Sequence, residues 1–170
     1  MKGIARCVAN TVLVAVCASI PSIAQSRDPE GLKGLKGVRL IVMFGRASAM
    51  DEAQKPIVLK LLQDDSKAKF QKAGIPLLEF ADEVENAGSP HFIVTITMDK
   101  PNGHVFPVVT RARLLQKVRL SRDASIEMSI CTWETDGVGD YELTNLEMLR
   151  GQVGVAVDQF IAAYREVNPK

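Results

Sequence analysis

The sequence predicts an α+β protein, a two-layer sandwich in which two helices cover one face of a mostly antiparallel sheet, in the order β-α-β-β-β-β-α. Three observations indicate this fold. An apolar, β-branched run begins at Val38, several segments alternate between apolar and polar residues, and two longer segments repeat apolar residues every three or four positions. Consecutive strands bracketed by two helices with one apolar stripe each are typical of such a sandwich.

The first half of the chain supplies a strand, a helix and a second strand. Residues 38–44 form a nearly continuous apolar run, as in a buried strand. A helix is expected from Pro56, which suits a first turn, to Ala73, and Gly74 is its expected left-handed end. A short strand is then predicted over 75–80. The helix stripe consists of Leu59, Leu62, Ser66, Phe70 and Ala73.

The second half supplies three strands and a helix. The strands are predicted over 91–98, 105–120 and 125–133, with a Pro101-Asn102-Gly103 turn after the first and a bend or bulge at Pro107. A glycine-rich acidic loop is expected over 134–143. Thr144 or Asn145 then caps a final helix that ends before Pro169. Its stripe consists of Leu149, Val153, Val157, Phe160 and Tyr164.

The alternation of the strands predicts their register, because a slip of one residue would move every side chain to the other face. A three-residue loop at 122–124 pairs Leu120 with Ile126, Arg119 with Glu127, Leu115 with Cys131 and Arg113 with Trp133, and it keeps the apolar residues together. The same logic pairs Ile96 with Phe106 and Val94 with Val108, and brings His91 near Arg111. The predicted core beneath the helices consists of Phe92, Val94, Ile96, Leu114, Val118, Met128 and Ile130.

Composition and charge exclude several classes of function. Hydrophobic residues make up 46% of the 170 residues, as in a globular protein, and 21 basic residues against 20 acidic ones give a net charge of +1. A nearly neutral chain is not expected to bind nucleic acid. No phosphate loop, nucleophile elbow or zinc-binding motif is present, and there are only two histidines. We therefore expect no cofactor and no enzymatic activity.

The N-terminus predicts export. Lys2 and Arg6 precede a short apolar run, Pro21 breaks it, and Ser22-Ile23-Ala24 resembles a signal-peptidase site. Residues 1–24 are thus predicted to be a cleaved signal peptide, 25–36 a flexible lead-in and 37–170 a single domain, periplasmic or secreted. Two alternatives are a retained anchor helix and lipidation of Cys17. Without a retained anchor, we expect membrane attachment only if Cys17 is lipidated.

Four short segments carry a resemblance. They are a Leu-Lys-Gly lead-in, the Gly-Ser-Pro turn before residue 91, the single tryptophan closing the last strand, and the Val-Asn-Pro-Lys terminus. In these the chain resembles uncharacterised small secreted bacterial proteins. The resemblance implies export but no activity and no site residues.

The sheet face away from the helices is the predicted working surface. A basic row with embedded apolar residues suits docking of an envelope protein or an acidic ligand. The alternative is a solvated face whose arginines lie over Trp133 and pair with Glu127. The residues predicted to bind are Arg111, Arg113, Leu115, Lys117 and Trp133.

The acidic loop offers weak candidates for calcium ligands, because carboxylate oxygens are the ligands that calcium prefers. They are Glu134, Asp136, Asp140 and Glu142. The sequence thus predicts a periplasmic binding or accessory domain that acts through its open sheet face. The alternatives are an enzyme of unrecognised class and a calcium-binding or membrane-tethered envelope module.

Overall fold

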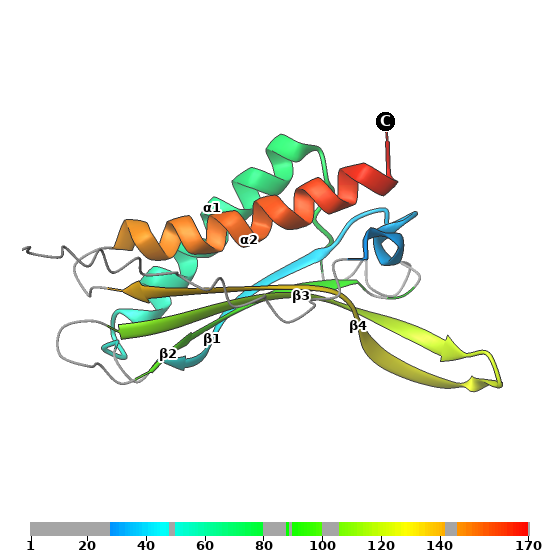
Figure 1. Cartoon of the computed structure of the whole chain (residues 1–170), viewed down its shortest axis with the longest axis horizontal. Coiled ribbons are helices and arrows are strands. Elements are labelled where there is room, and N and C mark those ends of the chain that lie inside the picture. Colours follow the sequence, from blue (N-terminus) through cyan, green and yellow to red (C-terminus); the bar gives the residue numbers. More distant parts are fainter. Residues whose placement is uncertain are drawn as a thin grey trace, which may run out of the picture.

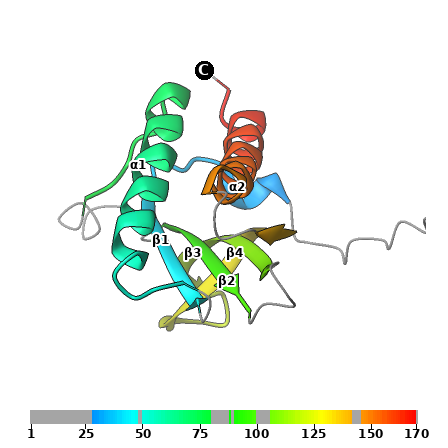
Figure 2. The ribbon, with the colours of Figure 1, turned by 90° about the vertical axis from the view of Figure 1, so that its left-hand side faces the viewer.

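The strands form one four-stranded sheet, and both helices pack against the same face of it (Figures 1 and 2). The computed structural model describes residues 28–47, 50–79, 88, 90–99, 106–141 and 146–169. The sheet order is β1-β2-β3-β4; β1 is parallel to β2, and the other two pairs are antiparallel. This confirms the predicted α+β sandwich. The elements are η1 (Pro29–Leu32), β1 (Arg39–Ala47), α1 (Lys55–Ala73), β2 (His91–Met98), β3 (Phe106–Leu120), β4 (Asp123–Tyr141) and α2 (Leu146–Val167).

Helix α1 follows its predicted pattern closely. It ends at Gly74, whose φ of 71° is the left-handed conformation that glycine adopts at low cost. The amide of Ile75 donates to the carbonyl of Phe70 at 3.1 Å and so satisfies one of the last carbonyls of the helix. The buried Ser66 donates its hydroxyl to the carbonyl of Leu62 at 2.7 Å, so it occupies an apolar face without an unpaired polar group.

An aromatic cluster fills the space between the helices and the sheet. Phe92 from β2 and Phe160 from α2 have ring centroids 4.4 Å apart, Trp133 from β4 lies 5.2 Å from Phe160, and Phe70 from α1 lies 5.5 Å from Phe92. Trp133 is only 1% exposed. The prediction that Trp133 lies on the outer face is therefore wrong, because its ring is part of the core.

A one-residue bulge explains this error. The predicted pairs from Leu115–Cys131 to Arg119–Glu127 are confirmed, but the register then shifts, and Leu114 rather than Arg113 pairs with Trp133. The extra residue is Thr132. Such an insertion reverses the alternation of the residues beyond it. No register shift, and therefore no bulge, occurs at Pro107, where a bend or bulge was predicted.

Strand β4 is much longer than predicted. The residues expected to form an acidic loop continue β4 to Tyr141 and pair with β3 as far as Phe106. An added Cβ on Gly139 would displace the side-chain amide of Gln152 on α2, which is the far end of a flexible side chain. The glycines that suggested a loop thus lie within a paired strand.

The distal parts of β3 and β4 form a two-stranded arm, defined here as residues 115–131, that extends beyond the helices (Figure 1). Phe92, Val94, Ile96 and Leu114 are fully buried, as predicted. The other predicted core residues lie on the arm, where no helix covers them: Met128 is 44% exposed, Ile130 is 38% exposed and Val118 is only partly buried. The turn comprises residues 121 and 122, and Leu120 pairs with Asp123 instead of Ile126.

The predicted register between β2 and β3 is also wrong. Ile96 pairs with Thr110 and Val94 with Ala112, four residues from the predicted partners, and His91 faces Leu115 instead of lying near Arg111. An even offset preserves the faces, so the buried set of β2 is still correct. The strand predicted over 75–80 is reduced, in its described part, to a single bridge between Val38 and Leu77.

The described part of the lead-in is packed, although it was expected to be flexible. Leu32 in η1 is fully buried, and the Asn168 side chain donates to its carbonyl at 2.9 Å. Among the described helices, none is long and apolar enough to cross a membrane. The predicted signal peptide, Cys17, the turn at 101–103 and the cap at Thr144 or Asn145 lie outside the described residues.

Candidate functional site: the open sheet face

The face of the sheet away from the helices carries both charged and apolar side chains. Strand pairing places Ile93, Arg113 and Glu134 in one row across β2, β3 and β4, and Thr95, Arg111 and Asp136 in the next. We call this surface the open sheet face. Its members on the body of the sheet are Ile41, Met43, Ile93, Thr95, Val109, Arg111, Arg113, Glu134, Asp136 and Val138, and Leu115, Lys117 and Cys131 continue it along the arm.

Arg111 is held by Asp136 on the neighbouring strand. Its Nε donates to Oδ1 at 2.7 Å and its Nη2 to Oδ2 at 3.2 Å, a two-pronged pair that is partly exposed to solvent. The hydrogen bonds from Asp136, followed by its charge, raise the pKa of Arg111 above its ordinary value. The basic row is therefore partly neutralised by Asp136, and the pairing with Glu127 that the solvated-face alternative named is made by Arg119.

Arg113 differs from Arg111 in its hydrogen bonding. It is partly buried, and its Nε is buried without a hydrogen-bond partner among the described residues. A buried donor without an acceptor is costly, and an acceptor supplied by a ligand would remove that cost. Leu115, the next residue of this face along β3, is also partly buried. The two residues together offer a hydrogen-bond donor beside an apolar side chain.

Cys131 pairs with Leu115 as predicted, and its thiol is exposed on the open sheet face. The Sγ lies 3.3 Å from the carbonyl of Trp133 as a hydrogen-bond donor. Desolvation, followed by the nearby charge of Glu134, raises the pKa of Cys131 above its ordinary value. Such a thiol is a weak nucleophile at neutral pH.

Two exposed apolar residues of the open sheet face escaped the sequence prediction. Met43 is 43% exposed, although it was placed in a fully buried run, and Val138 is 80% exposed, although it was placed in a loop. Met43 could have been placed correctly from the sequence, because it alternates with Leu40 and Val42 and therefore points to the other side of the strand. For Val138, glycines on both sides concealed the strand pattern.

Two of the four predicted calcium ligands do not lie in a loop, as the calcium hypothesis assumed. Glu134 and Asp136 lie on a strand and not in a loop, beside Arg113 and Arg111. Within the described part of the chain, no group of three or more histidine, cysteine, aspartate or glutamate side chains is arranged to hold a metal ion. The side chain of Asp140 and all of Glu142 lie outside that part.

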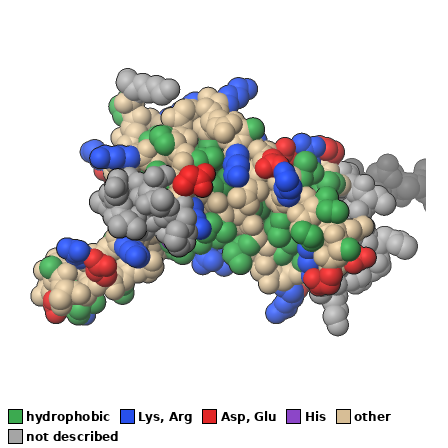
Figure 3. Space-filling model, turned by 180° about the vertical axis from the view of Figure 1, so that it is seen from behind, with side chains coloured by type: hydrophobic (Ala, Val, Ile, Leu, Met, Phe, Trp, Pro, Cys, Tyr) green, Lys and Arg blue, Asp and Glu red, His purple; other side chains and the backbone are tan. Residues whose placement is uncertain are grey.

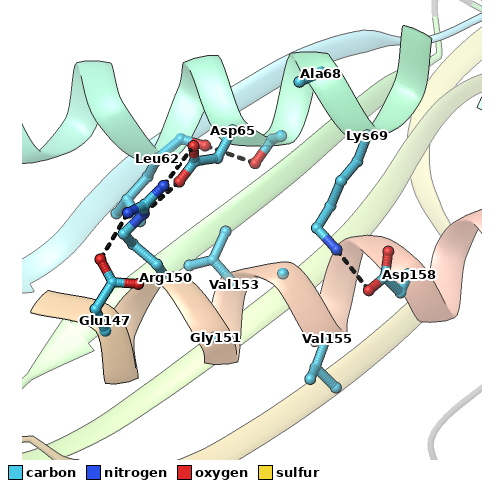
Figure 4. A pocket seen from close by; sticks show the side chains of 12 residues that line it. Leu62, Asp65, Ala68, Lys69, Glu147, Arg150, Gly151, Val153, Val155 and Asp158 are labelled. Carbon is cyan, nitrogen blue, oxygen red and sulfur yellow. Dashed lines mark hydrogen bonds and ion pairs between the residues drawn. The ribbon is translucent and has the colours of Figure 1, made fainter. Parts of the chain in front are cut away.

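A groove of about 380 Å³ between α1 and α2 carries a set of paired charges (Figure 4). Arg150 on α2 donates to both oxygens of Asp65 on α1, at 2.7 and 3.0 Å, and to Glu147 at 2.7 Å. Lys69 reaches across to Asp158 at 2.6 Å. Each charge in these pairs has a partner of opposite sign, so the groove is better explained as a connection between the helices than as a site for a charged ligand.

Comparison with known proteins identifies no family. No model of a protein family matches the chain, and no curated protein matches it. Among solved structures, one that matches is the dodecamer of a PelC variant from Paraburkholderia phytofirmans. It has 9% sequence identity and a TM-score of 0.40, and the match covers 74% of this chain and 89% of that one.

Proposed function

We propose that this protein is an exported binding domain of the bacterial envelope that engages a protein partner through its open sheet face. The observation that carries the proposal is the position of both helices on one face of the sheet, which leaves Met43, Leu115 and Val138 without a covering layer among the described residues. Exposed apolar residues rimmed by charges are a common feature of protein interfaces.

Arg113 and Leu115 are the expected centre of this interface. Arginine and large apolar side chains contribute much of the binding energy where they become fully desolvated. The Nε of Arg113, which has no partner among the described residues, would gain an acceptor on binding, and Leu115 would lose its remaining contact with water. Because Asp136 already neutralises Arg111, we expect a smaller effect of salt on binding than the basic row alone predicts.

The exported location rests on the N-terminal sequence. A basic start, a short apolar run and a small-residue site at Ser22-Ile23-Ala24 have the order of a signal peptide. Full-length protein expressed in a Gram-negative host would then appear in the periplasm with Gln25 as its first residue.

The test combines both parts of the proposal. The periplasmic protein is purified and its N-terminus is read by mass spectrometry, and it is then immobilised to capture partners from envelope extract. The double variant Arg113→Glu/Leu115→Glu should reduce capture of the major partner at least tenfold, because it reverses one anchor and places charge on the other.

A matched variant controls for the added acids. Lys72→Glu/Val155→Glu makes the same two types of change at exposed positions on the helices. It should leave capture within twofold of the original, and circular dichroism should show that both variants are folded. Equal capture by the Arg113/Leu115 variant would contradict binding through the open sheet face, and an intact Met1 would contradict export.

A further inference from the structure

The outer edge of β1 borders a cavity on the side of the molecule opposite α2, the side seen in Figure 3. Its volume is about 630 Å³. Strand β1 forms one wall, α1 forms another, and the segment over residues 75–79 closes one end. We call this cavity the edge slot. It is lined by Arg39, Leu40, Ile41, Gln63, Lys67, Gln71, Ile75, Pro76, Leu77, Leu78 and Glu79.

Backbone groups of β1 face this slot without a partner strand in the described part of the chain. On the side toward β2, the amide of Arg39 donates to the carbonyl of Pro90 at 2.9 Å. On the opposite side, the amide of Val38 donates to the carbonyl of Pro76, and the carbonyl of Val38 accepts from the amide of Leu78, both at 3.0 Å. Successive residues of a parallel strand direct their backbone groups to alternate sides. The backbone groups of Leu40 therefore point into the slot, and those of Val42 point out of the same edge.

The parallel pairing between Val38 and Leu77 is a single isolated bridge that does not continue along β1. Gly37 allows it to start, because a Cβ there would lie 2.7 Å from the carbonyl of Pro76. The next step would bring the carbonyl of Leu78 to the amide of Leu40, but these two described residues form no such bond. The slot thus begins where strand pairing ends, and it leaves donors and acceptors that an added strand would satisfy.

The helix wall of the slot is polar and basic. Gln63, Lys67 and Gln71 lie four residues apart along α1 and therefore share one side of the helix. Lys67 is exposed and forms no ion pair within 4 Å of another described residue, although its charge contributes to the lowered pKa of Asp64 one turn earlier in α1. A strand lying in the slot would direct alternate side chains toward this wall, where amides and an ammonium group favour a carboxylate.

We propose that the edge slot binds an extended peptide with an acidic side chain, which adds to the sheet as a fifth strand beside β1. Backbone hydrogen bonds to Leu40 and Val42 would supply the affinity, and the contact between the carboxylate and Lys67 would supply the selectivity. This site is separate from the open sheet face, since it lies at the edge of the sheet and includes a wall of α1.

The test follows the backbone amides directly. The exported protein, labelled with nitrogen-15, is titrated with the peptide acetyl-Thr-Val-Glu-Val-Thr-Val-amide while its nuclear magnetic resonance signals are recorded. Binding should shift the amide signals of Leu40 and Val42 and slow their hydrogen exchange at least fivefold. Lys67→Glu should weaken binding at least fivefold, whereas Lys72→Glu, an equal charge change on the same helix outside the slot, should weaken it less than twofold.

Two peptide controls identify the mode of binding. The same peptide with alternate amides N-methylated should not bind, because it lacks the donors that a strand requires, and replacement of its glutamate by lysine should weaken binding at least fivefold. The Arg113→Glu/Leu115→Glu variant should still bind the peptide, which separates this proposal from the proposed function.

Several outcomes would overturn the proposal. These are the absence of shifts at millimolar peptide, equal binding of the N-methylated peptide, and unchanged affinity of Lys67→Glu. Amides of Leu40 and Val42 that are already protected in the free protein would also overturn it. Protection that grows with protein concentration alone would overturn it as well, because a second copy of the chain would then fill the edge.

Discussion

At the scale of single residues, Thr132 determines which side chains reach the core. Its insertion into β4 turns Trp133 inward, into contact with Phe92 and Phe160, and leaves Cys131 on the opposite face. The Gln116 side chain fixes this bulge by donating to the Thr132 hydroxyl at 2.7 Å and to the carbonyl of Gly31 at 2.8 Å. One residue thus converts a predicted binding residue into a core residue.

The thiol of Cys131 provides a test at this scale. Because the charge of Glu134 is one cause of its raised pKa, Glu134→Gln should lower that pKa. A larger fraction of thiolate would then be present at pH 8, and alkylation by iodoacetamide should be faster than in the original protein. The rate is measured against pH, and the midpoint should move to lower pH.

Glu127→Gln is the control for this prediction. Glu127 lies on the same strand but pairs with Arg119 on the arm, and it is not among the groups that shift the pKa of Cys131. This variant should leave the midpoint in place. An unchanged midpoint in Glu134→Gln would mean that desolvation alone sets the reactivity of the thiol.

At the scale of elements, β4 passes through two environments. Its C-terminal half lies beneath α2 and buries Trp133 and Thr135, whereas residues 123–131 form one strand of the arm and are all exposed. The charged tip of the arm projects from the body in the space-filling view (Figure 3). Isolated two-stranded ribbons are marginally stable, so the arm depends on its continuity with the body.

The two helices allow a paired test of glycine. Gly74 ends α1 with a positive φ, so Gly74→Ala should lower the free energy of unfolding by about 1 kcal/mol. Gly151 lies inside α2, and a Cβ there would meet no atom within 4 Å. Gly151→Ala should therefore raise the free energy of unfolding by about 0.5–1 kcal/mol.

Urea denaturation measures both changes, and the opposite signs make the comparison sensitive. A loss of stability in Gly151→Ala would show that the groove between the helices is more crowded than its geometry indicates. A neutral result for Gly74→Ala would mean that the end of α1 adapts to a right-handed conformation.

At the scale of the whole molecule, the core is concentrated where both helices cover the sheet. Phe70, Phe92, Trp133 and Phe160 meet there, and the arm extends out of this region. Across the sheet, the cost of removing an apolar side chain should therefore depend on its distance from the helices and not on its hydrophobicity.

Ile96 and Met128 test this distribution. Ile96 is fully buried, so Ile96→Ala should lower the free energy of unfolding by about 2–5 kcal/mol through lost transfer energy and a cavity. Met128 is 44% exposed, and Met128→Ala should cost less than about 1 kcal/mol. Urea denaturation compares the two. A cost for Met128 as large as that for Ile96 would place the arm against a covering surface.

The local parts of this structure follow from the sequence. The stripes of α1 and α2, the end of α1 at Gly74 and the alternation of β2 all depend on residues close together in the chain, so their periodicity was sufficient. The sequence also identified Arg111, Arg113, Leu115 and Lys117 as neighbours on one face, because a strand alternates whatever its partner.

The tertiary structure decided what depends on distant residues. The bulge at Thr132 is stabilised by Gln116 and Gly31, the strand beyond Glu134 is stabilised by pairing with β3, and the β2–β3 register is one of several even offsets that bury the same faces. Coverage by the helices ends before the arm, which left Met128 and Ile130 exposed. Local periodicity determines which side of a strand is apolar, but only the assembled layers determine whether anything covers that side.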